Sequence, residues 1–405
     1  MSNLKKMQEG IIILYYSFFS EKNYFPNEKF IYLNKIESWP FIDSSFNDYF
    51  LNIFSKNCEI KSIPENILSA ELYDYNDELS NCNFTFETKL KYKGYKYLNV
   101  IKCGFQFYNL SVDEIQTESK LRSKLFYEKL IALDIPELRN KTKQIKEQLF
   151  FQKLKYQIVL IDHAKLSLTN RKYALLDLAL DRISGTAQKT IENTALQKNA
   201  HSNAFLQSLL DKSIIDQYQD WSTIISQKKI ITIYNCDSSD IRFNYLNNSV
   251  QFGLIYIQKI IIAELITILN LWVNENKFEN NLELSKYYMR FSRNFDFKII
   301  STKNLYNEYS NYLDVNLKIN EEKEIINEKI KEIENILEKE KNQLNNLLLF
   351  TIAIIQLITV FKDDIRNETA YIFHLNKDIT NHIISVSLLV ICTLIIYLFF
   401  KKRTM

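Results

Sequence analysis

The chain has 405 residues, enough for more than one domain, and 46% of them are hydrophobic, so a sizeable core can be buried. The formal net charge is only +3, which argues against a dedicated nucleic-acid binder, because such proteins are usually more basic. The five cysteines are odd in number and form no CxxC pair, which argues against a disulfide framework or a structural zinc site. We expect reduced thiols in a cytoplasmic domain.

Residues 1–280 predict a cytoplasmic α/β domain that acts as a sensor. Short apolar runs rich in β-branched and aromatic residues predict strands, and Lys93-Gly94 predicts a hairpin turn between two of them. The expected strands are 10–19, 84–92, 95–107, 155–161 and 229–234, and the expected helices are 112–132, 138–151, 170–217, 250–274 and one from about 303 onward.

A basic stretch in the middle of this domain is suited to an anionic ligand. Residues 120–172 contain thirteen Lys and Arg against five Asp and Glu. Within it an expected strand leads through a polar turn into a helix, and strand ends and helix N-termini both favour anionic ligands. Asp162, His163, Asn170 and Arg171 are therefore the candidate ligand-binding residues. The alternative is a solvated Lys-rich face in which Asn170 caps a helix.

Catalytic motifs are missing from the chain. The four histidines lie in no HExxH motif or comparable pair, and there is no P-loop, GxGxxG or GxSxG. Five glycines in the whole chain leave little room for a phosphate-cradling loop. We therefore expect no enzymatic activity and no cofactor, and the sequence identifies no metal ligands.

Residues 250–273 form a long apolar segment with Lys259 and Glu264 near its middle. On insertion scales, each charge would cost about 2.5–3.5 kcal/mol at the centre of a bilayer. We therefore expect an amphipathic helix buried in the first domain rather than a membrane span.

Residues 281–343 predict a helical stalk. Over 305–351, core positions recur at alternating spacings of four and three, which is a heptad pattern. We expect one helix of more than fifty residues that runs into the membrane. Such a rigid helix can transmit motion from the cytoplasmic domain to the first span, whereas a flexible linker would not. The alternative is a passive coiled-coil spacer. Asn316, Lys323 and Glu340 occupy core positions, which argues against a tight dimeric zipper.

Two uncharged segments of 18 residues, 344–361 and 383–400, are near the minimum length that crosses a hydrocarbon core of about 30 Å. A basic tail, 401–405, follows the second segment, and the positive-inside rule places it in the cytoplasm. Residues 362–382 then form the outer loop. This arrangement predicts a multi-pass protein of the inner (plasma) membrane with both termini cytoplasmic.

The first span carries a polar face. At about 100° per residue, Asn345, Gln356, Thr359 and Asp363 share one side of a helix that is otherwise mostly apolar. Polar groups in hydrocarbon need partners, so this face predicts a pore lining. Hydrogen bonding between packed helices is the alternative.

A long cytoplasmic helix, a first span, a short outer loop, a second span and a basic tail, here Lys401 to Arg403, resemble the organisation of the CorA family of membrane proteins. The resemblance covers residues 305–405. It implies a CorA-like funnel of five subunits, in which the first span lines the pore and the second surrounds it. Magnesium-transporting members carry Gly-Met-Asn after the first span, where this chain reads VFKDDIRN.

A CorA-like branch without Gly-Met-Asn is associated with type III CRISPR systems, and its members resemble membrane effectors switched by S-adenosylmethionine joined to AMP. The resemblance therefore implies a membrane channel or effector in antiviral defence. Its expected partners are further copies of the chain in a pentamer, the lipid bilayer and a small anionic nucleotide, without direct contact with nucleic acid. Two alternatives stay open: a divalent metal-ion transporter that uses Asp363 and Asp364 as a cation-attracting ring, and a non-conducting coiled-coil membrane tether.

Overall fold

In the computed structural model, the chain divides into two compact units, Met1–Asn327 and Glu328–Met405. The structure describes residues 7–24, 31, 44–63, 81–90, 92–162, 166–191, 202–216, 220–235, 239–275 and 281–360, together with residues 367, 368, 371, 379, 382 and 386.

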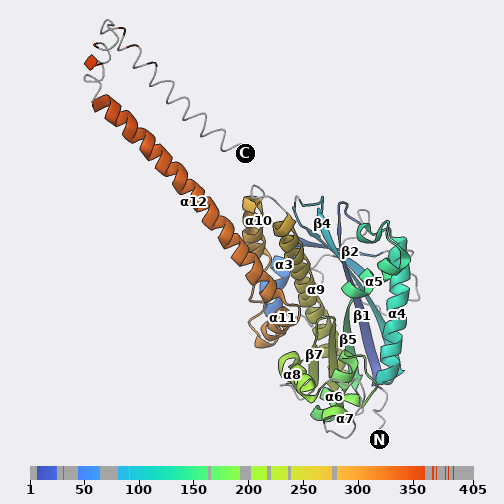
Figure 1. Ribbon diagram of the computed structural model, residues 1–405. Coiled ribbons are helices and arrows are strands. Elements are labelled where there is room, and N and C mark those ends of the chain that lie inside the picture. The colour runs from blue at the N-terminus through green and yellow to red at the C-terminus, as the bar shows by residue number, and fades with distance from the viewer. Residues whose placement is uncertain are drawn as a thin grey trace. The chain divides into compact units, whose positions relative to one another are not determined.

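The first unit is built on an eight-stranded mixed sheet with the strand order β2-β3-β4-β1-β5-β8-β7-β6 (Figure 1). β5 and β8 run parallel, and every other neighbouring pair is antiparallel. The strands are β1 (Met7–Ser20), β2 (Cys58–Ser62), β3 (Asn81–Glu87), β4 (Tyr97–Leu110), β5 (Lys155–Asp162), β6 (Ile214–Ile215), β7 (Trp221–Ile225) and β8 (Lys229–Asn235). The predicted α/β character of this part is therefore present, as a mixed sheet with helices.

Helices cover both faces of the sheet. α4, α5 and α6 pack on one face, and α9 packs on the other (Figure 1). The helices are α2 (Ser44–Phe46), α3 (Asn52–Asn57), α4 (Val112–Ala132), α5 (Lys143–Lys153), α6 (Leu168–Ala179), α7 (Thr186–Ile191), α8 (Asn203–Ser213), α9 (Ser239–Glu275), α10 (Asn281–Asn294), α11 (Asn304–Asn316) and α12 (Ile319–Val360), with a π-helical turn η1 (Asn47–Leu51) and a 3-10 turn η3 (Pro136–Leu138).

The central strand β1 is buried at every position from Gly10 to Ser20, which explains its unbroken apolar run, because both of its faces are covered. Gly10 is needed at the start of this run. A Cβ atom there would lie 2.2 Å from Cζ of Phe107 on β4, the strand that pairs with it.

Three cysteines, Cys58, Cys82 and Cys103, are buried and form no disulfide within the described part of the chain. The expectation of reduced thiols stays a prediction. Burial raises the pKa of the Cys58 and Cys103 thiols above the ordinary value. These thiols therefore stay protonated at neutral pH, and a protonated thiol is a poor nucleophile.

The predicted helix over 170–217 is wrong, because that stretch contains α6, α7, α8 and the short strand β6. α6 stops at Ala179, and the turn after it places Asp181 and Gly185 at positive φ. The buried carboxylate of Asp177 accepts hydrogen bonds from the N–H groups of Gly185 and Ala187, at 2.7 and 2.8 Å. A side chain within the expected helix therefore organises the turn that ends it.

The predicted unbroken helix from 303 onward is also wrong, because α11 and α12 are separate. Lys318 has a φ of +58°, and Leu317 and Lys318 donate backbone hydrogen bonds to Leu313 and Val315. This left-handed residue is a common helix ending. α12 then continues for 42 residues.

One helix segment among the described residues, Val250–Glu275 of α9, is long and apolar enough to cross a membrane by length and composition. Most of it (78% of its apolar window) is buried inside the protein. The two charged residues near its middle have partners: Lys259 pairs with Asp314, and Glu264 accepts a hydrogen bond from Ser17 at 2.7 Å. These contacts agree with the expectation of a helix buried in the first domain.

Candidate functional site

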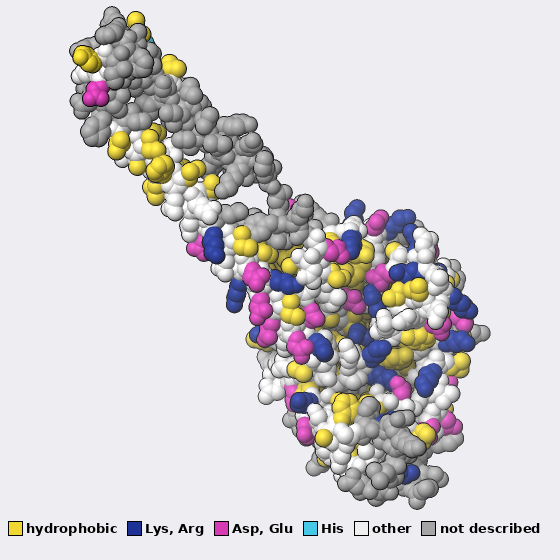
Figure 2. All heavy atoms as spheres, in the orientation of Figure 1, with side chains coloured by type: hydrophobic (Ala, Val, Ile, Leu, Met, Phe, Trp, Pro, Cys, Tyr) yellow, Lys and Arg dark blue, Asp and Glu magenta, His cyan; other side chains and the backbone are white. Residues whose placement is uncertain are grey.

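The C-terminal part of α12 exposes a run of apolar side chains. From Leu344 to Val360 the helix carries no charged residue, whereas its preceding turns are rich in Glu and Lys. Large apolar side chains exposed here are Leu347, Leu348, Leu349, Phe350, Ile352, Ile355, Leu357 and Val360 (Figure 2). Such a contiguous apolar surface indicates a lipid or protein partner. Thr351 donates its hydroxyl to the carbonyl of Leu347, one turn earlier, at 2.8 Å, so this polar group is satisfied within the helix.

Two of the predicted pore residues, Asn345 and Gln356, are exposed on α12. Thr359 belongs to the same helix, and at 100° per residue it lies near the same face. Asp363 lies outside the described residues. The three predicted residues Asn345, Gln356 and Thr359 therefore lie on one continuous helix.

The same face of α12 also contains apolar residues that the sequence analysis did not include. At about 100° per residue, with Asn345 at 0° and Gln356 at about 20°, Leu349 lies at about 40° and Ile352 at about −20°, one on each side of the two polar residues. Both side chains are exposed, at 63% and 43%. Along the helix axis, this face therefore presents a polar residue (Asn345), two apolar residues (Leu349 and Ile352) and a second polar residue (Gln356).

The first turns of α12 belong to the first unit and are fixed there by polar contacts. Nζ of Lys323 lies 2.5 Å from Oδ2 of Asp296, and Asn270 of α9 donates a hydrogen bond to Glu322. Ile326, on the same turns, is fully buried. Side chains from α9 and from the loop after α10 therefore hold the start of α12.

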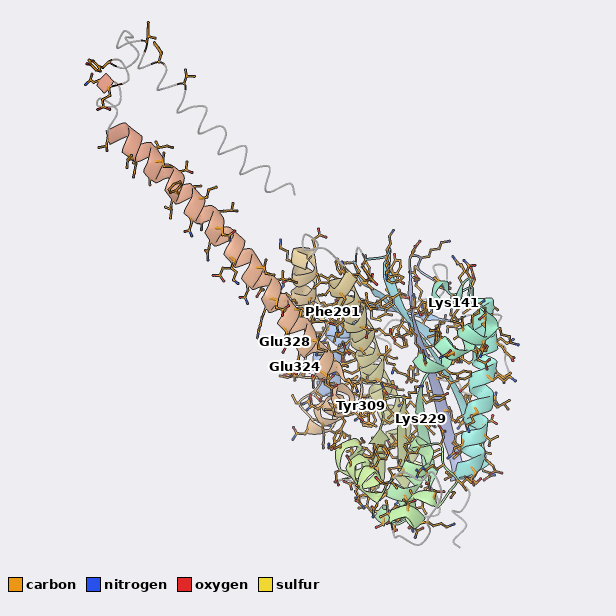
Figure 3. The ribbon with its side chains drawn as sticks, in the orientation of Figure 1. Lys141, Lys229, Phe291, Tyr309, Glu324 and Glu328 are labelled. Atoms are coloured by element: carbon orange, nitrogen blue, oxygen red, sulfur yellow. The ribbon has the colours of Figure 1, made fainter. Side chains whose placement is uncertain are left out.

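α11 is fixed to α9 in a similar way. Nζ of Lys259 lies 2.7 Å from Oδ1 of Asp314, and burial lowers the pKa of Lys259 although Asp314 opposes that shift. Tyr309 stacks on Phe252 with ring centroids 4.1 Å apart, and its side chain is buried (Figure 3). α9, α11 and the start of α12 form one packed layer.

The predicted ligand residues are only partly brought together. Asp162 is buried at the end of β5 and accepts a hydrogen bond from the N–H of Leu166 at 2.7 Å. Arg171 is also buried, and burial lowers its pKa while Asp162 and Asp220 act in the opposite direction. These acidic neighbours balance the charge of Arg171 inside the protein.

The other two predicted ligand residues do not extend this cluster. Asn170 is exposed, and Ser167, not Asn170, caps α6 by accepting a hydrogen bond from the N–H of Asn170 at 3.3 Å. His163 lies outside the described residues. Binding of a ligand by these four residues stays a prediction.

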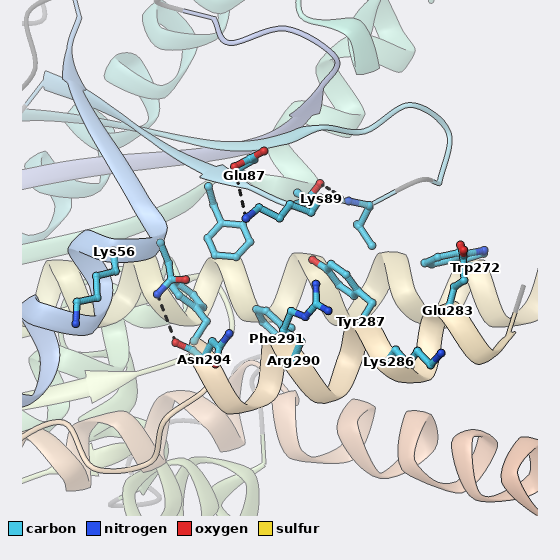
Figure 4. Close-up of a pocket in the computed structure, with 15 residues that line it drawn as sticks. Lys56, Glu87, Lys89, Trp272, Glu283, Lys286, Tyr287, Arg290, Phe291 and Asn294 are labelled. Carbon is cyan, nitrogen blue, oxygen red and sulfur yellow. Dashed lines mark hydrogen bonds and ion pairs between the residues drawn. The ribbon is translucent and has the colours of Figure 1, made fainter.

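A cavity of about 470 Å³ lies elsewhere, between the end of β3, the end of α3 and one side of α10 (Figure 4). Its apolar lining is aromatic except for Leu90. The ring centroid of Phe86 lies 4.7 Å from that of Phe295 and 6.2 Å from that of Phe291. Trp272 of α9 and Tyr287 of α10 add two more rings to the lining.

Basic residues outnumber acidic ones around this cavity. The charged lining residues are Lys56, Glu87, Lys89, Glu283, Lys286 and Arg290. Glu87 lies 4.0 Å from Lys89. Within the described part of the chain, Lys56, Lys286 and Arg290 form no ion pair. Tyr287 and Arg290 reach from α10 toward the segment after β3 that carries Lys89 (Figure 4).

This cavity could not be predicted from the sequence, because β3, α3 and α10 are far apart in the chain. One local signal was present in KYYMRF, residues 286–291. Lys286 and Arg290 are four residues apart, as are Tyr287 and Phe291, so a helix places two cations and two aromatic rings in adjacent rows.

Comparisons with family models, with curated proteins and with solved structures found no match. Among the described residues, no group of three His, Cys, Asp or Glu side chains is arranged to hold a metal ion. The features of this chain that point to a function are α12, its attachment to the first unit and the cavity beside α10.

Proposed function

We propose that this chain is a CorA-like membrane channel or effector in which residues 344–361 cross the bilayer and line a pore. One observation carries the proposal. A single 42-residue helix, α12, begins with an ion pair to the sheet-containing unit, between Lys323 and Asp296, and ends in a run of exposed apolar side chains. A water-soluble surface would not leave that run uncovered, and a continuous helix transmits displacement along its axis.

The polar face of α12 supports a pore formed by several copies of the chain. One helix cannot enclose a channel, so the proposal requires a homo-oligomer, and the CorA resemblance suggests a pentamer. The amide groups of Asn345 and Gln356 would be costly in contact with lipid tails. Around a water-filled axis they remain hydrated, while the apolar residues of the other faces contact lipid or neighbouring helices.

Leu349 and Ile352 give this pore a closed state. Between the polar positions Asn345 and Gln356, a ring of these side chains would form a hydrophobic constriction, which can block ions by excluding water. A small rotation of α12 would move the ring off the axis. The gate proposed here is therefore an apolar belt within a polar lining.

The trigger in this proposal is a small anionic nucleotide bound by the first unit, of the type of S-adenosylmethionine joined to AMP. Opening would perturb the inner membrane in a CRISPR-linked antiviral defence, with both termini in the cytoplasm and residues 362–382 and 383–400 as outer loop and second span. The ligand type and the biological setting rest on the CorA-like layout and the missing Gly-Met-Asn motif.

Ion flux through liposomes tests this function. The purified full-length protein is reconstituted with an entrapped ion indicator, and flux is measured with S-adenosylmethionine–AMP, with Mg²⁺ and Co²⁺, and with neither. We expect nucleotide-dependent flux that Gln356→Leu reduces about tenfold, since one lost polar contact raises the barrier by about 1.4 kcal/mol. Leu347→Ile, on the opposite face, should behave as wild type.

Two results would replace this function with another. Transport of Mg²⁺ or Co²⁺ without any nucleotide response would favour the divalent metal-ion transporter. A protein that is firmly inserted in the membrane but passes no ion under any condition would favour the coiled-coil tether, for which the charged first half of α12 is sufficient.

A further inference from the structure

We propose that the cavity between β3 and α10 binds a flat aromatic molecule that carries a phosphate group, of the size of a single nucleotide. Its role as the trigger of the channel rests on the proposed function, but its binding chemistry does not. Four observations support this site: its volume, its aromatic lining, its position next to the contact that holds α12, and three cations that form no ion pair with another described residue.

The size of the cavity fits one small organic molecule. Its volume of about 470 Å³ lies in the lower part of the range of about 300–1,000 Å³ for small-molecule sites. The cavity is bounded by elements from three separate regions of the chain, α3, β3 and α10, so that a bound molecule would contact all three (Figure 4). A polymer such as RNA would need a longer groove.

The aromatic lining is suited to a planar ring. Phe86 meets Phe291 edge to face and Phe295 at a tilt, and Phe291 and Phe295 are stacked. Trp272 and Tyr287 supply further aromatic surface beside them. Stacking on such a surface contributes about 1–3 kcal/mol per base where it has been measured in nucleic-acid sites. The same surface offers little to a bare inorganic ion.

The charged lining selects an anion. Lys56, Lys286 and Arg290 form no ion pair within the described part of the chain, whereas Glu87 already has Lys89 close by. Arg290 can bind a phosphate through two parallel hydrogen bonds. The cations lie on both sides of the aromatic lining, Lys56 on α3 and the other two on α10, so ring and phosphate can be bound together.

The cavity also adjoins the attachment of α12. Phe295 lines the cavity, and the next residue, Asp296, forms the ion pair with Lys323 of α12. The carbonyl of Phe295 accepts a hydrogen bond at 3.0 Å from Gln258 of the buried helix α9. A ligand that shifts Phe295 would therefore shift the carboxylate that holds α12.

Calorimetric titration of the detergent-purified full-length protein tests the site with AMP, adenosine and inorganic phosphate as probes. We expect AMP to bind, and adenosine and phosphate to bind at least about tenfold more weakly, because each lacks one half of the interaction. Arg290→Gln should weaken AMP binding by about tenfold or more. Arg293→Gln is the matched control, because Arg293 is exposed on the same helix but does not line the cavity.

Three outcomes would overturn the proposal: no binding of AMP, equal binding of AMP and phosphate, or equal losses in Arg290→Gln and Arg293→Gln. Unchanged thermal unfolding of both variants shows that they are folded. The result is separable from the channel proposal. AMP binding without ion flux in liposomes would leave the site intact and reject the channel, and flux without AMP binding would do the reverse.

Discussion

Asp296 and Lys323 join the end of the α10 region to the first turns of α12, with Oδ2 and Nζ 2.5 Å apart. Their side chains are mostly buried, at 6% and 17% exposure. Because Asp296 follows Phe295, a residue of the cavity lining, this pair connects the proposed ligand site to the proposed pore helix. Substituting either side chain of this ion pair tests whether the ligand site and the pore helix are coupled.

The first prediction concerns this ion pair. Asp296→Asn should lower the free energy of unfolding by about 1–3 kcal/mol, because Lys323 loses its charged partner in a mostly buried position. AMP affinity should stay near wild type, while ligand-dependent ion flux should disappear. Glu321→Gln is the control, since Glu321 lies 4.0 Å from Lys318 in an exposed pair worth less than about 1 kcal/mol. Normal ligand-dependent flux in Asp296→Asn would contradict the proposed coupling.

The second prediction concerns the buried pair of Lys259 and Asp314, at 1% and 14% exposure. Lys259→Met should destabilise the protein by about 3–5 kcal/mol, because it leaves Asp314 without its partner. Combining it with Asp314→Leu should recover most of the loss, since two apolar side chains replace the whole pair. Urea unfolding of the two single variants and the double variant measures this. A double variant no more stable than Lys259→Met would show that the pair is not the source of the cost.

The third prediction tests the apolar belt. Ile352→Asn should raise ion flux in the absence of ligand, because a polar side chain at the constriction keeps it hydrated. Ile354→Asn is the control, since Ile354 lies about 160° from Ile352 around the helix and faces away from the proposed axis. Liposome flux without nucleotide is the measurement. Equal flux in the two variants, or none in either, would exclude a hydrophobic gate at this level.

The fourth prediction concerns pH and Asp177. Burial raises the pKa of this carboxyl to about 6 from 3.8, against the opposing effect of hydrogen bonds from Ala187 and Gly185. Between these two values the folded protein binds the proton more tightly than the unfolded chain, so protonation stabilises the fold. This contribution is complete below about pH 4 and falls by about 3 kcal/mol as the pH rises through 6.

Asp177→Asn removes the titrating group and should remove this pH dependence. The difference in unfolding free energy between the two proteins, measured by denaturant titration at pH 4.5 and pH 7, should shift in favour of the variant at the higher pH. The asparagine can accept only one of the two backbone hydrogen bonds, so a constant offset is also expected. A difference that does not change with pH would show that Asp177 does not titrate with a raised pKa.

Strands of the sheet could be predicted from the sequence where local pattern decides the outcome. Five of the eight strands, β1, β3, β4, β5 and β8, correspond to predicted apolar runs, because an unbroken or alternating apolar pattern is a local property. β2, β6 and β7 were missed. β6 has only two residues and follows directly on α8, so its pairing with β7 depends on long-range contacts that no short pattern reports.

Helix boundaries and the cavity depended on side chains that act at a distance. The turn after α6 is set by Asp177, which bonds to residues eight and ten positions later. The break before α12 depends on the left-handed conformation of Lys318, a residue type with no preference for it. α3, β3 and α10 come together around the cavity only in the folded protein. The KYYMRF pattern alone therefore could not show that its side chains line a cavity.

Thiol accessibility tests whether the face of α12 that carries Asn345 and Gln356 lines a pore. Gln356→Cys and Leu347→Cys, each in a Cys392→Ser background, are reconstituted into planar bilayers, and current is recorded before and after a positively charged thiol reagent. We predict that the reagent reduces the current of Gln356→Cys and leaves that of Leu347→Cys unchanged, because only the face of Asn345 and Gln356 meets water. Equal responses in the two variants, or loss of current in Leu347→Cys alone, would contradict a pore lined by this face of α12.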